Sequence, residues 1–144
     1  MKQNSENTNA FLIHISAFAG LIFPFGNIIT PLVAWQTLKD RSSFLDEHGK
    51  EAINFNISYS LYFLIFSIFA SSFFISDFFR NFNGFNNHNY FNFHVDTENV
   101  FGFLGLGSLA GIVYLTGIAL VIIAALKAKE GENYTYPFTI KFIK

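Results

Sequence analysis

The stretch SSFLDEHGKEAINFNISYSLYFLIFSIFASSFFI, residues 42–75, joins a polar start to a long apolar run. Its first ten residues hold five charged or imidazole side chains: Asp46, Glu47, His48, Lys50 and Glu51. From Ile53 to Ile75 there is no charged residue. A helix of that length is about 34 Å long, and the hydrocarbon core of a bilayer is about 30 Å thick. The stretch therefore predicts a membrane-spanning helix over 53–75 with a polar entrance.

Composition places the whole chain in a membrane. Of its 144 residues, 51% are hydrophobic and only 13% are charged, whereas ordinary globular proteins have roughly 25% charged residues. A soluble chain of this length exposes a large share of its surface and needs more polar residues to cover it. The net charge of −1 and the lack of a basic stripe argue against nucleic acid as a partner. We expect the lipid bilayer to be the main partner.

Two further apolar segments are expected to cross the membrane, at 10–38 and 100–126. The first contains Pro24 and Pro31, each of which interrupts the backbone hydrogen bonds of a helix. We favour an all-α polytopic integral membrane protein with three transmembrane helices, the first kinked at its prolines. The alternative is that the first segment folds back at Pro24–Asn27 as a helical hairpin, which gives four helical segments.

The remaining residues are assigned around these spans. Residues 1–9 are predicted to be a polar tail, and 10–144 a single transmembrane domain. The loop 76–99 is rich in aromatic residues and is expected to lie against the membrane surface. The segment 127–144 is expected to be extended or interfacial, with Tyr134 and Tyr136 as membrane anchors.

Lysine and arginine counts predict the orientation. With three spans, Lys2 and Arg80 lie on one side and the other seven basic residues on the opposite side. Basic residues in short loops favour the cytoplasm, so the 39–50 loop and the C-terminus are expected to be cytoplasmic. In the hairpin alternative Lys2 changes side and the bias becomes eight to one. We therefore predict a multi-pass protein of the cytoplasmic (inner) membrane.

Four polar residues at helical spacing form a candidate site, which we call the polar stripe: Glu47, Glu51, Asn54 and Ser58. Three more polar residues are candidate neighbours: His14, Asn27 and His48. Polar groups inside a membrane must face protein or water. We expect Glu51 to pair with donors near Asn27, and Asn54 and Ser58 with carbonyl groups left free by Pro31. The alternatives are a polar vestibule for an ion, a proton or a peptide, and a metal site made by His48, Glu51 and His14.

The last span contains GxxxG at Gly107 and Gly111. Small residues let helix backbones approach closely in lipid, so we expect these two glycines to pack helices together, within the chain or across a homodimer. No nucleophile–base–acid set, phosphate-binding loop or metalloprotease motif is present in the sequence. We therefore predict no enzymatic activity, no catalytic residue and no cofactor.

Four stretches carry a family resemblance: HISAFAG (14–20), PFGNIITPLVAW (24–35), FLDEHGKEAINFNIS (44–58) and AALKAKEGENYTYPFTIKFI (124–143). Together they resemble a family of small bacterial membrane proteins of unknown function that is grouped with the Tic component of the chloroplast import machinery. The resemblance implies an all-helical membrane protein with three or four helical segments and no catalytic residues. It does not cover the loop 76–99.

Two functions fit these observations. The first is a scaffold or assembly partner in the cytoplasmic membrane, bound to copies of itself or to other membrane proteins. The second is a polar-lined conduit or translocation component for ions, small solutes or peptides. We favour the scaffold, because three short helices make a thin-walled pore unless they oligomerise. The sequence names no solute, partner, process or oligomeric state.

Overall fold

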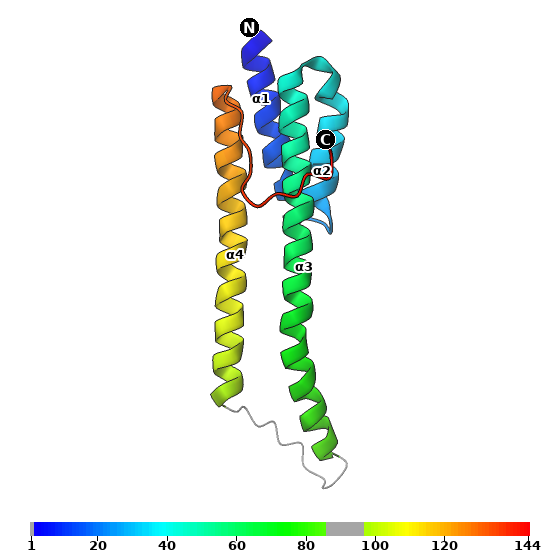
Figure 1. The fold of residues 1–144 in the computed structure, drawn as a ribbon, viewed down its shortest axis with the longest axis vertical. Coiled ribbons are helices and arrows are strands. Elements are labelled where there is room, and N and C mark those ends of the chain that lie inside the picture. Colours follow the sequence, from blue (N-terminus) through cyan, green and yellow to red (C-terminus); the bar gives the residue numbers. More distant parts are fainter. Residues whose placement is uncertain (1, 86–96) are drawn as a thin grey trace. The chain divides into compact units, whose positions relative to one another are not determined.

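The computed structural model describes residues 2–85 and 97–144. These residues form helices followed by a C-terminal segment, residues 131–144, that lacks helix and strand (Figure 1). The helical elements are α1 (Lys2–Ile15), the 3₁₀ helix η1 (Ser16–Leu21), α2 (Gly26–Leu38), the 3₁₀ helix η2 (Lys39–Arg41), α3 (Ser43–Phe85) and α4 (Thr97–Glu130). The all-α class predicted from the sequence is therefore present throughout the described residues.

The first apolar segment is a helical hairpin. After η1 the chain reverses, and α2 runs back beside η1 and α1 (Figure 1). Phe25 adopts a left-handed backbone conformation at φ 62°. At Gly26 a Cβ atom would lie 2.4 Å from the Ala19 carbonyl oxygen, so only glycine permits this close approach. The expected kinked span over 10–38 is thus wrong, and the hairpin alternative describes the structure. Pro31 lies inside α2 without ending it.

The polar N-terminal residues also differ from expectation. Residues 2–9 belong to α1 rather than to a separate tail. The Asn7 side chain donates a hydrogen bond to the Lys129 carbonyl at 3.2 Å, which joins α1 to the end of α4. A contact between residues so far apart in sequence is not visible in a local polar pattern.

The helices α3 and α4 are longer than the predicted spans 53–75 and 100–126. The former continues to Phe85 and so includes the first part of the predicted loop 76–99. Residues 86–96 of that loop lie outside the described residues. Among the described residues, two stretches are long and apolar enough to cross a membrane, Ser43–Ser72 and Val100–Glu130. By contrast, α2 has 13 residues and is about 20 Å long, too short to cross.

The chain forms two compact units. The first comprises Met1–Leu61 with Leu115–Lys144, and the second comprises Tyr62–Tyr114. The buried residues of the first unit gather in two apolar clusters, one of Ala10, Ile13, Leu45, Ala52 and Ala128, the other of Ala17, Phe55, Val121, Ala124 and Tyr136. In the second unit many large apolar side chains are exposed, among them Leu64, Ile68, Phe69, Leu104 and Ile112. Such a surface fits lipid rather than water.

The glycines that pack closely are not those of the GxxxG motif. A Cβ atom at Gly117 would lie 2.6 Å from the Tyr59 ring, and one at Gly49 would lie 2.0 Å from the Trp35 ring. At Gly107 and Gly111 no atom of the described chain comes within 4 Å. The internal contact expected at the GxxxG motif is therefore missing from the described structure, and a seam between two copies remains a prediction.

Candidate functional site

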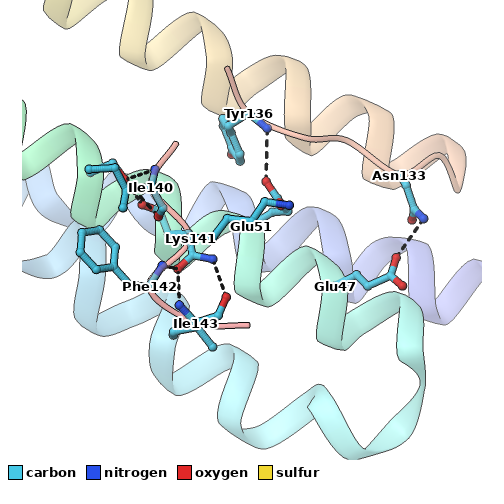
Figure 2. A network of polar contacts seen from close by, with 10 residues as sticks. Glu47, Glu51, Asn133, Tyr136, Ile140, Lys141, Phe142 and Ile143 are labelled. Atoms are coloured by element: carbon cyan, nitrogen blue, oxygen red, sulfur yellow. Dashed lines mark hydrogen bonds and ion pairs between the residues drawn. The ribbon is translucent and has the colours of Figure 1, made fainter. Parts of the chain in front are cut away.

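The polar stripe of α3 faces the C-terminal segment. Each of its four residues hydrogen-bonds to this segment, and five labelled residues from Tyr136 to Ile143 lie along it in Figure 2. The helical spacing of the stripe places its side chains in a row. The C-terminal segment contacts Glu47, Glu51 and Ser58 in order. It then turns back so that Phe142 and Ile143 reach Asn54. The partner of the stripe is thus a segment that was expected to be extended or interfacial.

Asn54 binds the last residues of the C-terminal segment. Its Oδ1 atom accepts hydrogen bonds from the backbone N–H groups of Phe142, at 3.0 Å, and Ile143, at 2.9 Å. Its Nδ2 atom donates to the Ile143 carbonyl at 2.9 Å. Asn54 is 1% exposed. The amide side chain thus pairs with both backbone polar groups of one residue, Ile143, as a neighbouring β-strand would.

Ser58 holds the segment one turn further along α3. Its hydroxyl donates to the Asn54 carbonyl at 2.7 Å and accepts a hydrogen bond from the Ile140 N–H at 2.9 Å. The first bond lies within the helix and fixes the rotamer of the hydroxyl. The second leaves the helix and pairs a backbone group of the C-terminal segment. Asn54 and Ser58 therefore act through main-chain atoms and place little demand on the side chains of that segment.

The two carboxylates of the stripe bind the C-terminal segment at more exposed positions than Asn54 and Ser58 do. Glu51 accepts a hydrogen bond from the Tyr136 N–H at 3.3 Å and lies 3.7 Å from the Lys141 ammonium (Figure 2). Glu47 accepts a hydrogen bond from the Asn133 side chain at 3.0 Å. Ion pairs with exposed partners contribute little to stability. These contacts fix the start of the segment, while the buried amide and hydroxyl fix its end.

The partners expected on the first segment are not those observed. We expected Glu51 to meet donors near Asn27, and Asn54 and Ser58 to meet carbonyl groups near Pro31. Instead, Asn27 donates a hydrogen bond to the Ser60 hydroxyl at 2.9 Å. The reason is that the freed carbonyl groups of a proline lie on another helix, whereas the C-terminal segment lies directly on the stripe.

Beside the stripe lies a buried polar cluster, which we call the imidazole pair: His14 and His48. The Nε2 atom of His14 and the Nδ1 atom of His48 are 2.8 Å apart, so one of these nitrogens carries a proton and the other accepts the hydrogen bond. The Nδ1 atom of His14 is 2.9 Å from the Tyr136 hydroxyl. The Nε2 atom of His48 is buried without a hydrogen bond among the described residues. Tyr136, His14 and His48 thus form a chain of hydrogen bonds inside the first unit.

Tyr136 connects the imidazole pair to the C-terminal segment. Its ring stacks on Phe55, with centroids 4.0 Å apart, and is almost fully buried. Burial, with Tyr134 and Glu51 nearby, raises the pKa of the Tyr136 phenol well above its usual range. We had predicted this tyrosine to be a membrane anchor. Nothing in the local sequence separates a buried tyrosine from an interfacial one, because both positions favour a ring with a polar tip.

The metal-site alternative is not supported by this arrangement. The facing nitrogens of His14 and His48 bond to each other, and the Glu51 carboxylate bonds to the C-terminal segment. No group of three metal-binding side chains occurs in the part of the chain that the structure describes. Chemically, the site binds backbone groups of the C-terminal segment and provides a short hydrogen-bond chain.

Comparison with known proteins gives one result. No curated protein and no solved structure matches the chain. A family model matches residues 5–143, which include the hairpin, the polar stripe, the imidazole pair and nearly all of the C-terminal segment. This match is consistent with the predicted membership in a family of small membrane proteins, and it shows no link to the Tic component. The chain belongs to the MamF_MmsF family, described as the Magnetosome magnetite crystal formation protein family.

Proposed function

We propose that the protein is a non-catalytic membrane scaffold that holds an assembly partner at the membrane. The observation that carries this proposal is the occupied polar stripe. An open, water-lined stripe would favour a conduit. Instead, the buried side chains of Asn54 and Ser58 are hydrogen-bonded to backbone groups of the chain's own C-terminal segment. The family description adds the setting: the assembly would serve crystal formation inside a membrane compartment.

The orientation is part of the proposal. The hairpin brings Lys2 to the side of the 39–50 loop and the C-terminus, which leaves Arg80 alone among the basic residues on the other side. The excess of basic residues then favours a cytoplasmic first unit. In this topology α3 and α4 cross the cytoplasmic membrane, or a membrane derived from it, and the 39–50 loop and the C-terminus face the cytoplasm.

A specific feature also favours a second function, a conduit or translocation component. The chain from Tyr136 through His14 to His48 is a series of groups that can both donate and accept protons. The resemblance to a family grouped with the Tic import component belongs to the same alternative. A proton pathway would need this chain to reach water on both sides of the bilayer.

Flux measurements separate the two functions. The purified protein is reconstituted into liposomes that contain a pH-sensitive dye, and a potassium diffusion potential drives protons inward. If the protein is a scaffold, the proton flux into these liposomes should equal the leak into protein-free liposomes. A proton flux above that leak that disappears in His48→Phe would establish the conduit instead.

A crosslinking experiment tests the scaffold directly. A photoreactive amino acid replaces Phe138, which is 91% exposed in the C-terminal segment, and a matched variant carries it at the buried Ala128. In membranes of the source cells, the scaffold predicts discrete adducts from the exposed position and none from the buried one. If neither position gives adducts, the scaffold proposal fails.

A further inference from the structure

The tip of the α1–α2 hairpin is apolar and exposed. The turn that joins η1 to α2 contains Ile22, which is 85% exposed, and Phe25, which is 71% exposed. Leu21 and Phe23 are exposed beside them. No charged residue occurs between Ala10 and Leu38. Turns in water are normally built from polar residues, so this tip is suited to another environment.

The length of the hairpin limits how far it can reach. The 13 residues of α2 span about 20 Å, less than the roughly 30 Å hydrocarbon core. Asn27, at the start of α2, is hydrogen-bonded to Ser60 of α3 at 2.9 Å. Ser60 lies seven residues beyond Ile53, the start of the uncharged run of α3, which is about 10 Å along the helix. The tip thus lies level with the outer half of an apolar span.

Several backbone groups of the tip are hydrogen-bonded within the hairpin, which suits an environment without water. Inside a bilayer every backbone polar group needs a partner within the protein. The N–H groups of Ile22 and Phe23 both donate to the Ala19 carbonyl, at 3.0 and 3.1 Å. The Gly26 N–H donates to Phe23, and the next turn of α2 donates to the Phe25 carbonyl. Pro24 has no N–H to satisfy. The reversal therefore satisfies these N–H groups without water.

We propose that the α1–α2 hairpin inserts into one leaflet of the bilayer and does not cross it. Acyl chains surround Ile22 and Phe25, and both arms of the hairpin open to the same face of the membrane. The occupant of the apolar tip is lipid. Three observations select it: the tip is uncharged, the N–H groups of Ile22, Phe23 and Gly26 are bonded within the hairpin, and Asn27 holds it beside the apolar part of α3. This inference does not depend on the scaffold proposal, since a conduit could carry the same hairpin.

The chain lacks cysteine, so single cysteines report position without background. Cysteine replaces Ile22 or Phe25 at the tip, and Ser5 or Thr37, which are exposed near the open ends of the two arms. Each variant is labelled with an environment-sensitive fluorophore and reconstituted into phosphatidylcholine vesicles. The lipids carry bromine near the headgroup, at mid-chain, or at the chain end. Emission from Trp35, the sole tryptophan, checks that each variant is folded.

One-leaflet insertion predicts that mid-chain bromine quenches the tip labels more strongly than chain-end bromine, and that bromine hardly affects the labels at Ser5 and Thr37. Unlabelled tip cysteines should resist an impermeant maleimide from both sides, whereas the other two cysteines react from one and the same side. Reaction of the Ser5 and Thr37 cysteines from opposite sides would mean that the segment crosses. Tip labels that lipid does not quench, with disulfide formation between copies, would mean that the tip is a protein interface, and would overturn the proposal.

Discussion

The Asn54 carboxamide pairs with both the N–H and the C=O of Ile143, two bonds of 2.9 Å that join α3 to the end of the chain across 89 positions. This pairing satisfies the hydrogen-bonding groups of the Asn54 side chain, which is buried in the polar stripe. A helix side chain takes the place that a β-strand backbone would normally fill, and the C-terminal segment is held by its main chain. The consequences of this arrangement can be tested one residue at a time.

Asn54→Leu should release the C-terminal segment. The substitution leaves the N–H groups of Phe142 and Ile143 and the Ile143 carbonyl without partners, and a buried unsatisfied polar group costs about 1–3 kcal/mol. Asn56 is the matched control, because its amide bonds only to the Ala52 carbonyl of its own helix. We expect Asn54→Leu to lower the melting temperature in mild detergent and to make the segment sensitive to protease. Equal effects of Asn54→Leu and Asn56→Leu would contradict the pairing.

Glu51→Gln should cost less than Asn54→Leu. The Tyr136 N–H can still donate to the oxygen of a glutamine amide, and the ion pair with Lys141 involves an exposed ammonium, so its loss costs roughly 0–1 kcal/mol. Chemical unfolding of both variants in the same detergent gives the comparison. A larger loss for Glu51→Gln would show that the charge itself matters, and would favour the conduit over the scaffold.

Tyr136→Phe should reveal a pH-dependent part of the stability. The pKa of the buried phenol is raised in the folded protein, so its contribution is complete below the ordinary pKa of about 10 and is lost as the pH rises beyond it. We expect the free energy of unfolding to fall above that pH in the native sequence and to fall less in Tyr136→Phe. At neutral pH the variant should be destabilised by about 1–3 kcal/mol, because the Nδ1 atom of His14 loses its partner. Equal alkaline slopes would show that Tyr136 is not buried.

Gly49→Ala should disturb the contact between α2 and α3. An added Cβ would lie 2.0 Å from the Trp35 ring, and the indole N–H of that residue is hydrogen-bonded to Asp46 at 2.9 Å. Overpacking of this kind typically costs about 1–3 kcal/mol. Trp35 is the sole tryptophan, so a red shift of the emission should accompany a lower melting temperature. Unchanged emission with unchanged stability would contradict the observed packing.

Two glycines of α4 provide a matched pair for helix packing. Gly117→Leu should destabilise the chain, since a Cβ there already meets the Tyr59 ring at 2.6 Å. Gly111→Leu should leave the stability of the single chain unchanged, because no described atom lies within 4 Å of its Cβ position. Crosslinking in membranes then tests the predicted seam between copies. Loss of a crosslinked dimer in Gly111→Leu would place the GxxxG motif between two chains, and destabilisation of the monomer would show an internal contact instead.

The helical class, the apolar runs of α3 and α4 and the spacing of the polar stripe follow from the sequence by itself. Uncharged runs of more than 20 residues and side chains recurring every three or four positions are local properties, and helical geometry converts them directly into spans and faces. Local sequence does not decide whether residues 10–38 form a kinked span or a hairpin. Pro24 allows both, and the reversal depends on Gly26 fitting against Ala19.

The partners of the polar stripe were decided by tertiary structure alone. The sequence indicates that the polar side chains of Glu51, Asn54 and Ser58 need hydrogen bonds, but any segment with free backbone groups can supply these bonds. The segment that does so is residues 131–144, far along the chain, and it also places Tyr136 beside the imidazole pair. The sequence determines which groups each side chain can bind, because the residue type sets its hydrogen-bond donors and acceptors. Only the folded chain determines which groups come within reach, because burial of the whole first unit selects one arrangement of its helices and its C-terminal segment.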